Sequence, residues 1–212
     1  MDINISAITE AVLKAIENTS TDDGEIPVGI SNRHIHLSKE DVETLFGAGY
    51  ELTPCKELSQ PGQYACKELL TIVGPSLRPI EKVRVLGPVR SASQVEISRT
   101  DAYVLKVSPP VRESGKTEGS APITIIGPKG VVTLKEGLII ANRHIHMSLE
   151  DGEKFGVKDN DYVDVDAYSE RRTRFFDVQV RVHKNFRLEM HLDTDDANAA
   201  GLKNGSKVSI VK

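Results

Sequence analysis

The sequence has little of what marks a membrane, secreted or disulfide-rich protein. Its 212 residues include no Trp, and aromatic residues make up 5%. No apolar stretch reaches the roughly 18 residues needed to span a bilayer, and the first residues lack the basic and apolar regions of a secretory signal. Two cysteines, Cys55 and Cys66, are too few for a disulfide framework and are not in CxxC spacing. We therefore expect a cytosolic protein with both thiols reduced.

Positive charge is also scarce. The formal net charge is -4, and Lys and Arg never cluster beyond an adjacent pair. A nucleic-acid partner is therefore not expected, nor is a membrane partner. Hydrophobic residues at 39% and charged residues at 27% are ordinary for a globular protein, and the length suits one large domain or two small ones.

Four of the six histidines stand in two copies of one pentapeptide, Asn-Arg-His-Ile-His. The copies cover residues 32–36 and 142–146, and each follows a short apolar run and precedes a Ser-x-Glu-Asp sequence. The apolar run predicts a strand, and a Ser followed by acidic residues predicts a helix N-cap. Each His-x-His pair is thus expected where a strand gives way to a short helix.

A second internal similarity supports a repeat. Residues 83–102 align without gaps with residues 178–197, which places Glu96 opposite His191. The first half then carries about 15 extra residues, which we assign to an inserted segment at about 47–68. A repeat of this kind indicates two related units.

Short β-branched or alternating segments make up most of the remaining sequence. Turn sequences such as Gly127–Gly130 separate them, and no amphipathic helix lies between successive strands. This pattern favours a mainly β fold built of small antiparallel β-barrels with short capping helices.

The N-terminus differs from this pattern. Ile5, Ile8, Val12 and Ile16 recur at helical spacing, and polar residues follow up to Gly24. Residues 1–24 are therefore predicted to form an amphipathic helix and a linker. The helix could pack on the body of the protein or dock on a partner through its apolar face.

Alternate side chains of a strand share a face, so each His-x-His pair can reach one metal ion. The repeat adds a third ligand to each pair. The two sets are His34, His36 and Glu96, and His144, His146 and His191. His₂Glu and His₃ sets are typical of catalytic zinc, although cobalt, manganese and iron also accept such ligands. His183 lies outside both sets.

Three arginines lie close to these sets in the sequence. Arg90 follows a Gly-Pro turn six residues before Glu96, and an arginine beside metal ligands suits a phosphate. Arg33 and Arg143 adjoin the two pairs, and for them a phosphate contact and a surface salt bridge are both open.

Other functions are compatible with parts of this pattern. Glu40 and Glu150 complete the HxHx₃E spacing of cupin metal sites, which favours a cupin-like oxygenase or isomerase. Because Ser38 and Ser148 are predicted to cap helices first, we expect these two glutamates to lie at helix N-termini instead. A third interpretation is a non-enzymatic metal-binding component of a protein shell.

Several longer motifs make the resemblance to one family specific. The chain resembles the phosphotransacylases of the propanediol-utilisation type, the PduL family of phosphate propanoyltransferases. The matching stretches run from residue 25 to about 200 and cover residues 28–38, 60–65, 86–91, 93–102, 143–148 and 188–191.

The resemblance implies two related β-barrels with the active site between them. One barrel would comprise residues 25–32 and 142–212, and the other residues 33–141. The site would hold two zinc ions on the two ligand sets, with Arg90 on phosphate. Coenzyme A would contact the positions that match the family's binding residues, which are Ser31, Lys56, Arg84, Leu86 and Asn198, and we expect Asn32 to contact it as well.

The implied activity is the interconversion of a short-chain acyl-CoA and phosphate with acyl phosphate and coenzyme A. Propanoyl-CoA is the expected substrate, followed by acetyl-CoA, and we expect direct metal-assisted transfer. In family members housed in bacterial microcompartments for propanediol degradation, a similar N-terminal helix directs encapsulation. Residues 1–20 would thus bind shell or lumen proteins inside such a compartment, and a homo-oligomer is compatible with the sequence.

Overall fold

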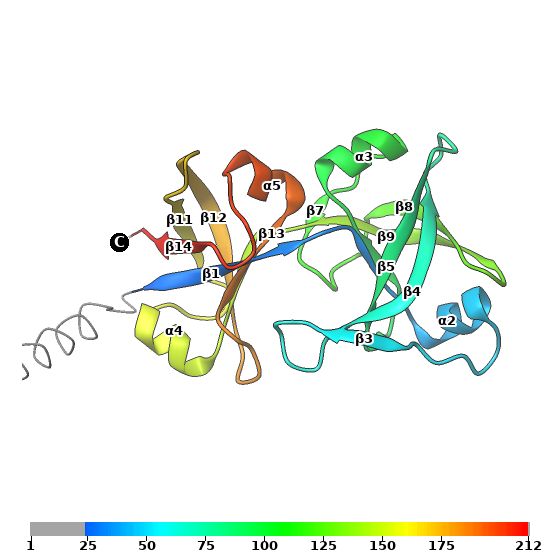
Figure 1. The fold of residues 1–212 in the computed structure, drawn as a ribbon, viewed down its shortest axis with the longest axis horizontal. Helices are drawn as coiled ribbons and strands as arrows, with labels where there is room; N and C mark the ends of the chain where they lie inside the picture. The colour runs from blue at the N-terminus through cyan, green and yellow to red at the C-terminus, as the bar shows by residue number, and fades with distance from the viewer. Residues whose placement is uncertain (1–23, 212) are drawn as a thin grey trace, which may run out of the picture.

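The computed structural model describes residues 24–211, which form two β-barrels side by side (Figure 1). The predicted helix in residues 1–24 falls, except for Gly24, outside the described residues. No helix among the described residues is long and apolar enough to cross a membrane.

Six strands close the first barrel, which we call the C-terminal barrel. Around its circumference the order is β1, β13, β10, β12, β11, β14. The strands are β1 (Glu25–Ser31), β10 (His144–Met147), β11 (Tyr162–Ala167), β12 (Thr173–Val182), β13 (Glu189–Asp193) and β14 (Lys207–Ile210).

Six strands also pair in a closed ring in the second barrel, which we call the central barrel. They are β2 (His34–His36), β4 (Tyr64–Val73), β5 (Pro79–Gly87), β6 (Gln94–Glu96), β8 (Ala121–Ile126) and β9 (Val131–Ala141). Two further strands extend it, since β3 (Pro54–Glu57) pairs with β4 and β7 (Val111–Arg112) pairs with β9.

The chain crosses between the barrels at both copies of the pentapeptide. β1 ends at Ser31 in the C-terminal barrel, and β2 begins at His34 in the central barrel. β9 ends at Ala141 in the central barrel, and β10 begins at His144 in the C-terminal barrel. Each Asn-Arg pair therefore lies at the boundary between the barrels, and each His-x-His pair starts the strand that follows it.

The predicted fold class is confirmed, but the strand pairing is mixed. Within the C-terminal barrel β1 pairs parallel to β13 and β10 parallel to β12, and within the central barrel β2 pairs parallel to β5 and β6 parallel to β9. These four parallel pairs stand beside the antiparallel pairs that the sequence predicted. Two of these parallel pairs, β1–β13 and β6–β9, join a strand of one sequence repeat to a strand of the other, whereas β2–β5 and β10–β12 each join two strands of the same repeat.

Short helices cap the barrels, as predicted. They are α2 (Lys39–Phe46), α3 (Arg99–Leu105), α4 (Leu149–Phe155) and α5 (Thr194–Ala199). Ser38 and Ser148 are N-caps whose side chains accept the backbone N–H groups of Asp41 and Asp151. Glu40 and Glu150 lie in the first turns of these helices, as expected.

Each barrel has its own hydrophobic core. Ile35, Leu70 and Leu138 are almost fully buried in the central barrel, and Ile145 and Val180 are fully buried in the C-terminal barrel. The isoleucine between the two histidines of each pair thus points into a core. The histidines on either side of it point away from that core, toward the neighbouring barrel.

Candidate active site

Strand register brings the three predicted ligands of each set together. β2 is antiparallel to β6, and His34 lies opposite Glu96. β10 is antiparallel to β13, and His144 lies opposite His191. The offset found in the sequence is therefore a real structural equivalence, because Glu96 and His191 occupy matching positions beside the first histidine of each pair.

The cluster in the central barrel consists of His34, His36 and Glu96, all buried. Nε2 of His34 lies 3.4 Å from Oε2 of Glu96, and Nε2 of His36 lies 3.8 Å from Oε1. The other cluster consists of His144, His146 and His191, in which Nδ1 of His146 lies 3.1 Å from Nε2 of His191. Within each cluster the candidate ligand atoms all lie within 4.8 Å of one another.

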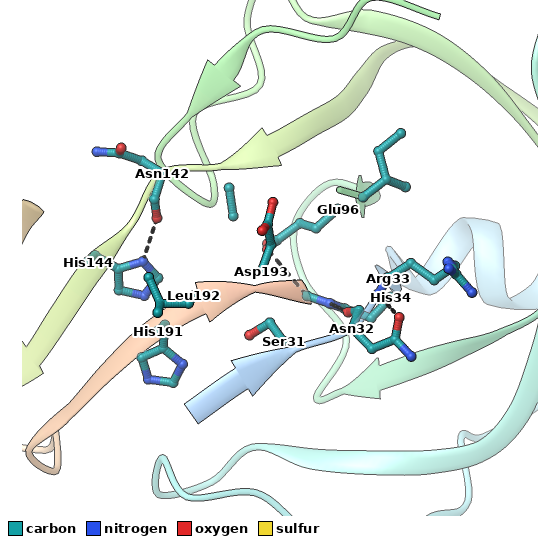
Figure 2. Close-up of a pocket in the computed structure, with 12 residues that line it drawn as sticks. Ser31, Asn32, Arg33, His34, Glu96, Asn142, His144, His191, Leu192 and Asp193 are labelled. Atoms are coloured by element: carbon teal, nitrogen blue, oxygen red, sulfur yellow. Dashed lines mark hydrogen bonds and ion pairs between the residues drawn. The ribbon is translucent and has the colours of Figure 1, made fainter. Parts of the chain in front are cut away.

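A backbone carbonyl orients the first histidine of each pair. Nδ1 of His34 lies 2.8 Å from the carbonyl oxygen of Asn32, and Nδ1 of His144 lies 2.8 Å from that of Asn142 (Figure 2). A carbonyl oxygen only accepts hydrogen bonds, so in both rings Nδ1 donates its hydrogen and the neutral ring keeps a lone pair on Nε2. Metal-ligating histidines are commonly oriented in this way.

Burial keeps most of these rings neutral. Burial and the charge of His34 lower the pKa of His36 to about 3. Burial and the charge of His144 lower the pKa of His191 to about 3. The same two causes lower the pKa of His146. Burial also opposes a charge on His34, but the adjacent Glu96 carboxylate outweighs it and raises the pKa of His34. Burial would raise the pKa of Glu96, yet the charges of His34 and His36 hold it far below its usual value.

The two clusters fit divalent metal ions. Neutral imidazoles with available lone pairs and an ionised carboxylate are the donors that zinc accepts. The buried Nδ1 of His36 also lacks a hydrogen-bond partner within the described part of the chain. Buried polar atoms usually have a partner, so the chemistry of the donor set is consistent with a cation at this place.

A cleft of about 690 Å³ runs between the barrels and reaches both clusters. His34 and Glu96 approach it from the central barrel, and His144 and His191 from the C-terminal barrel (Figure 2). Five of the six positions expected to contact coenzyme A line this cleft, namely Ser31, Asn32, Lys56, Arg84 and Leu86. The sixth, Asn198, is exposed on α5 and is not among the lining residues.

Arg90 lines the same cleft on the side of the central barrel. Its backbone N–H donates to the carbonyl oxygen of Leu37, and its guanidinium donates to Oγ of Ser114 at 3.1 Å. Ser114 donates in turn to Oε1 of Glu96 at 2.7 Å. Burial lowers the pKa of Arg90, and within the described residues no carboxylate forms an ion pair with it. An unpaired, half-buried cation is a natural contact for an anion.

Arg33 and Arg143 have ion pairs with equivalent partners. Arg33 binds Asp101 of α3, with its Nε 2.9 Å and one terminal nitrogen 2.7 Å from Oδ1. Arg143 lies 3.6 Å from Asp196 of α5. Of the two interpretations left open by the sequence, the geometry favours the salt bridge, since these carboxylates occupy the guanidinium groups.

Several residues around the cleft were missed by sequence reasoning. They are Ser59, Gln60, Gln94, Glu113, Ser114, Arg181, Phe186 and Glu189. Arg181 and Glu189 could have been found from the repeat, because they take the positions of Leu86 and Gln94 beside the ligands. The others come from loops whose approach to the site depends on how the barrels pack. His183 is exposed and outside both clusters, as expected.

Comparison with known proteins places the chain in a family. The family model for phosphate propanoyltransferase matches residues 27–203. Proteins of that name are 62% identical over 188 residues in Thermotoga maritima, covering 88% of this chain and 89% of that one. In Lachnoclostridium phytofermentans the identity is 55% over 212 residues and 99% of each chain. In Priestia megaterium it is 51% over 201 residues, 95% of this chain and 92% of that one.

These matches define an enzyme of the acyltransferase class, built from two barrels with a cleft between them. More narrowly, the chain belongs to the phosphate propanoyltransferase family. The resemblance seen in the sequence is thereby confirmed. The cupin-like interpretation receives no support, since Glu40 and Glu150 lie on capping helices and the relatives are transferases.

Proposed function

We propose that this chain interconverts a short-chain acyl-CoA and inorganic phosphate with acyl phosphate and coenzyme A. Propanoyl-CoA is the proposed substrate, with acetyl-CoA as a second. The observation that carries the proposal is Arg90, which forms no ion pair within the described part of the chain, beside two clusters of ligand-type residues in one cleft. The names of the relatives support the same reaction.

In the forward direction a phosphate oxygen attacks the thioester carbonyl carbon. The C–O bond of the acyl phosphate forms, the C–S bond breaks, and the electron pair leaves on the sulfur of coenzyme A, which takes up the proton that hydrogen phosphate loses. Arg90 binds and orients the phosphate through its planar guanidinium. Ser114 links Arg90 to Glu96, because its hydroxyl accepts a hydrogen bond from Arg90 and donates one to Glu96. Neither Cys55 nor Cys66 lies in the cleft lining, so no protein nucleophile is assigned.

The proposed cofactors are two zinc ions, one on His34, His36 and Glu96 and the other on His144, His146 and His191. Bound there, they would supply positive charge that stabilises the developing oxyanion and thiolate. Coenzyme A is proposed to contact Ser31, Asn32, Lys56, Arg84 and Leu86, which line the cleft. Asn198, exposed on α5, would have to reach it from outside that lining.

Direct transfer is tested by steady-state kinetics. We expect intersecting lines when propanoyl-CoA and phosphate are varied together, because both substrates must occupy the cleft at once. A ping-pong pattern with a trapped acyl-enzyme would contradict direct transfer.

The metal assignment is tested by elemental analysis of the purified chain. Two zinc per chain are expected, and His34→Ala and His144→Ala should each lose one. Lys129→Ala, a change at an exposed residue that does not line the cleft, serves as the control. One iron per chain with oxygen consumption would instead support the oxygenase interpretation.

We also propose that residues 1–20 direct the enzyme to the inside of a bacterial microcompartment, in a pathway such as propanediol degradation. The support is the apolar spacing of Ile5, Ile8, Val12 and Ile16, together with the family resemblance. Deleting residues 1–20 should leave activity unchanged and abolish co-localisation with shell proteins. Loss of activity in the deletion variant would assign the helix to the body of the enzyme.

A further inference from the structure

Arg181 is a second cationic residue of the cleft, and it comes from the barrel opposite Arg90. It lies on β12, in parallel register with His146 of β10. Its side chain lines the cleft and is 25% exposed. In the internal repeat its counterpart is Leu86, so this charge is a feature of one half only and is not required by the barrel fold.

Neighbouring side chains hold Arg181 in place. One terminal nitrogen lies 3.3 Å from Oε1 of Glu113, and the guanidinium carbon lies 5.8 Å from the ring centre of Phe186. Glu113 also accepts from Lys116 at 2.6 Å and from Gln179 at 3.3 Å. Glu113 belongs to the central barrel, so Arg181 is oriented across the boundary between the barrels.

The positive charges of Arg90 and Arg181 act on the same part of the cleft. The charge of Arg181 adds to burial in lowering the pKa of Arg90 and of the histidines of the second cluster. The Glu113 carboxylate also forms an ion pair with Lys116. The Glu96 carboxylate pairs with His34 and accepts hydrogen bonds from Gln94 and Ser114. Five cationic residues line the cleft, namely Arg33, Lys56, Arg84, Arg90 and Arg181, against three carboxylates, namely Glu57, Glu96 and Glu189, so the lining has an excess of positive charge. Such a site favours a multiply charged anion that reaches both guanidinium groups.

We propose that Arg181 is a second phosphate-binding residue, which contacts the phosphoryl group of phosphate and of acyl phosphate from the side opposite Arg90. Glu113 is its positioning residue. The anion would thus be held between a guanidinium of each barrel, in a site that is complete only when the barrels are correctly packed. This inference rests on the proposed function, because it takes phosphate as the anion bound by Arg90.

A purely structural role makes a different prediction. If the Arg181–Glu113 pair only joined the barrels, its loss would lower stability without favouring one substrate over the other. Partly exposed ion pairs contribute little to stability, so that role would have a small effect overall. The substrate dependence of the kinetic change therefore separates the two roles.

The experiment compares Arg181→Gln, Arg181→Lys and Arg90→Gln in the full chain. Arg174→Gln is the matched control, because Arg174 also lies on β12 and pairs with a carboxylate, Asp166, at 2.7 Å, but outside the cleft. For Arg181→Gln we expect the KM for phosphate to rise by about 10-fold or more, since a charge-assisted hydrogen bond is lost. The KM for propanoyl-CoA should stay within about 2-fold, the zinc content should not change, and Arg181→Lys should recover part of the loss.

Glu113 has its own test as a positioning residue. Glu113→Gln should raise the KM for phosphate by a smaller factor than Arg181→Gln, because the guanidinium remains but is less well oriented. Glu113→Asp should recover part of that change. If Glu113→Gln alters the KM values for both substrates equally, the positioning role is wrong.

The outcomes separate this inference from the proposed function. If wild-type CoA release does not depend on phosphate, the proposed function fails. If wild type and Arg90→Gln behave as expected while Arg181→Gln keeps a wild-type KM for phosphate, only the inference about Arg181 fails. Binding of inorganic phosphate to folded Arg181→Gln, followed by calorimetry, provides a second measurement if turnover is too slow to measure. Wild-type affinity in that experiment would also overturn the inference.

Discussion

Arg33 and Arg143 occupy equivalent places in the two halves but have different surroundings. Arg33 makes two short contacts to Asp101, which is 3% exposed and belongs to the capping box of α3. Arg143 lies farther from Asp196, and both side chains of that pair are more than a third exposed. Solvent screens the Arg143–Asp196 pair more than the Arg33–Asp101 pair. Replacing each arginine by the same residue should therefore lower the free energy of unfolding by different amounts.

Arg33→Ala is predicted to lower the free energy of unfolding by about 1–3 kcal/mol, because it leaves the buried Asp101 carboxylate without its charged donor. Arg143→Ala, the matched control, is predicted to cost less than about 1 kcal/mol. Urea unfolding of the two variants checks this. Equal losses in the two variants would contradict the assignment of Arg33 to a buried pair.

At the scale of elements, the β8–β9 hairpin packs against the end of α2. The backbone N–H of Lys129 donates to the carbonyl oxygen of Leu45 at 3.0 Å. A Cβ added at Gly130 would lie 2.3 Å from the carbonyl oxygen of Thr44, which is backbone and cannot rotate away. The turn was predicted from its Gly and Pro residues, but the requirement for glycine arises from the contact with α2, which no local pattern reveals.

Gly130→Ala is therefore predicted to destabilise the fold by about 1–3 kcal/mol through overpacking between the hairpin and α2. Lys129→Ala changes an exposed side chain in the same turn and should lie within about 0.5 kcal/mol of wild type. The comparison is made by urea unfolding. A Gly130→Ala variant as stable as Lys129→Ala would show that the turn has room to move.

Some contacts between these elements could be predicted from the sequence, and others could not. Both ligand clusters could be predicted, because strand alternation and the repeat fix which side chains face one another, as His34 does with Glu96. The parallel pairs could not be predicted from propensity, because propensity does not fix the direction of a neighbouring strand, and two of the pairs, β1–β13 and β6–β9, join strands of different repeats. The roles of Arg181 and Glu113 could not be predicted for a similar reason, because the two residues come into contact only when the two barrels pack together.

At the scale of the whole molecule, contacts from the inserted segment join the two barrels beside the cleft. The side chain of Gln60, which is 3% exposed, donates to the carbonyl oxygen of Arg187 at 3.0 Å and accepts from its N–H at 3.1 Å. Ser59 donates to Glu189 beside them. At the boundary between the barrels the N–H of Thr100 also donates to Asp195 at 2.7 Å. These contacts join the central barrel to the C-terminal barrel around the site.

Gln60→Ala should therefore loosen the barrels, because both backbone groups of Arg187 lose their partner at a cost of about 1–3 kcal/mol. Gln63→Ala in the same loop is the control. Hydrogen exchange at the Arg187 amide should be faster in Gln60→Ala than in Gln63→Ala, with a lower free energy of unfolding. Unchanged protection of that amide would mean that other contacts fix the two barrels.

The central claim is the proposal that an acyl group passes directly between coenzyme A and phosphate in a cleft that contains two clusters of candidate metal ligands. Its most direct test is the formation of propanoyl phosphate from propanoyl-CoA and phosphate by the full chain, trapped as the hydroxamate. We predict equal yields of coenzyme A and propanoyl phosphate that saturate with phosphate, disappear on chelation and return with added zinc. Coenzyme A release that is independent of phosphate, or undiminished product formation by the chelated protein, would contradict the claim.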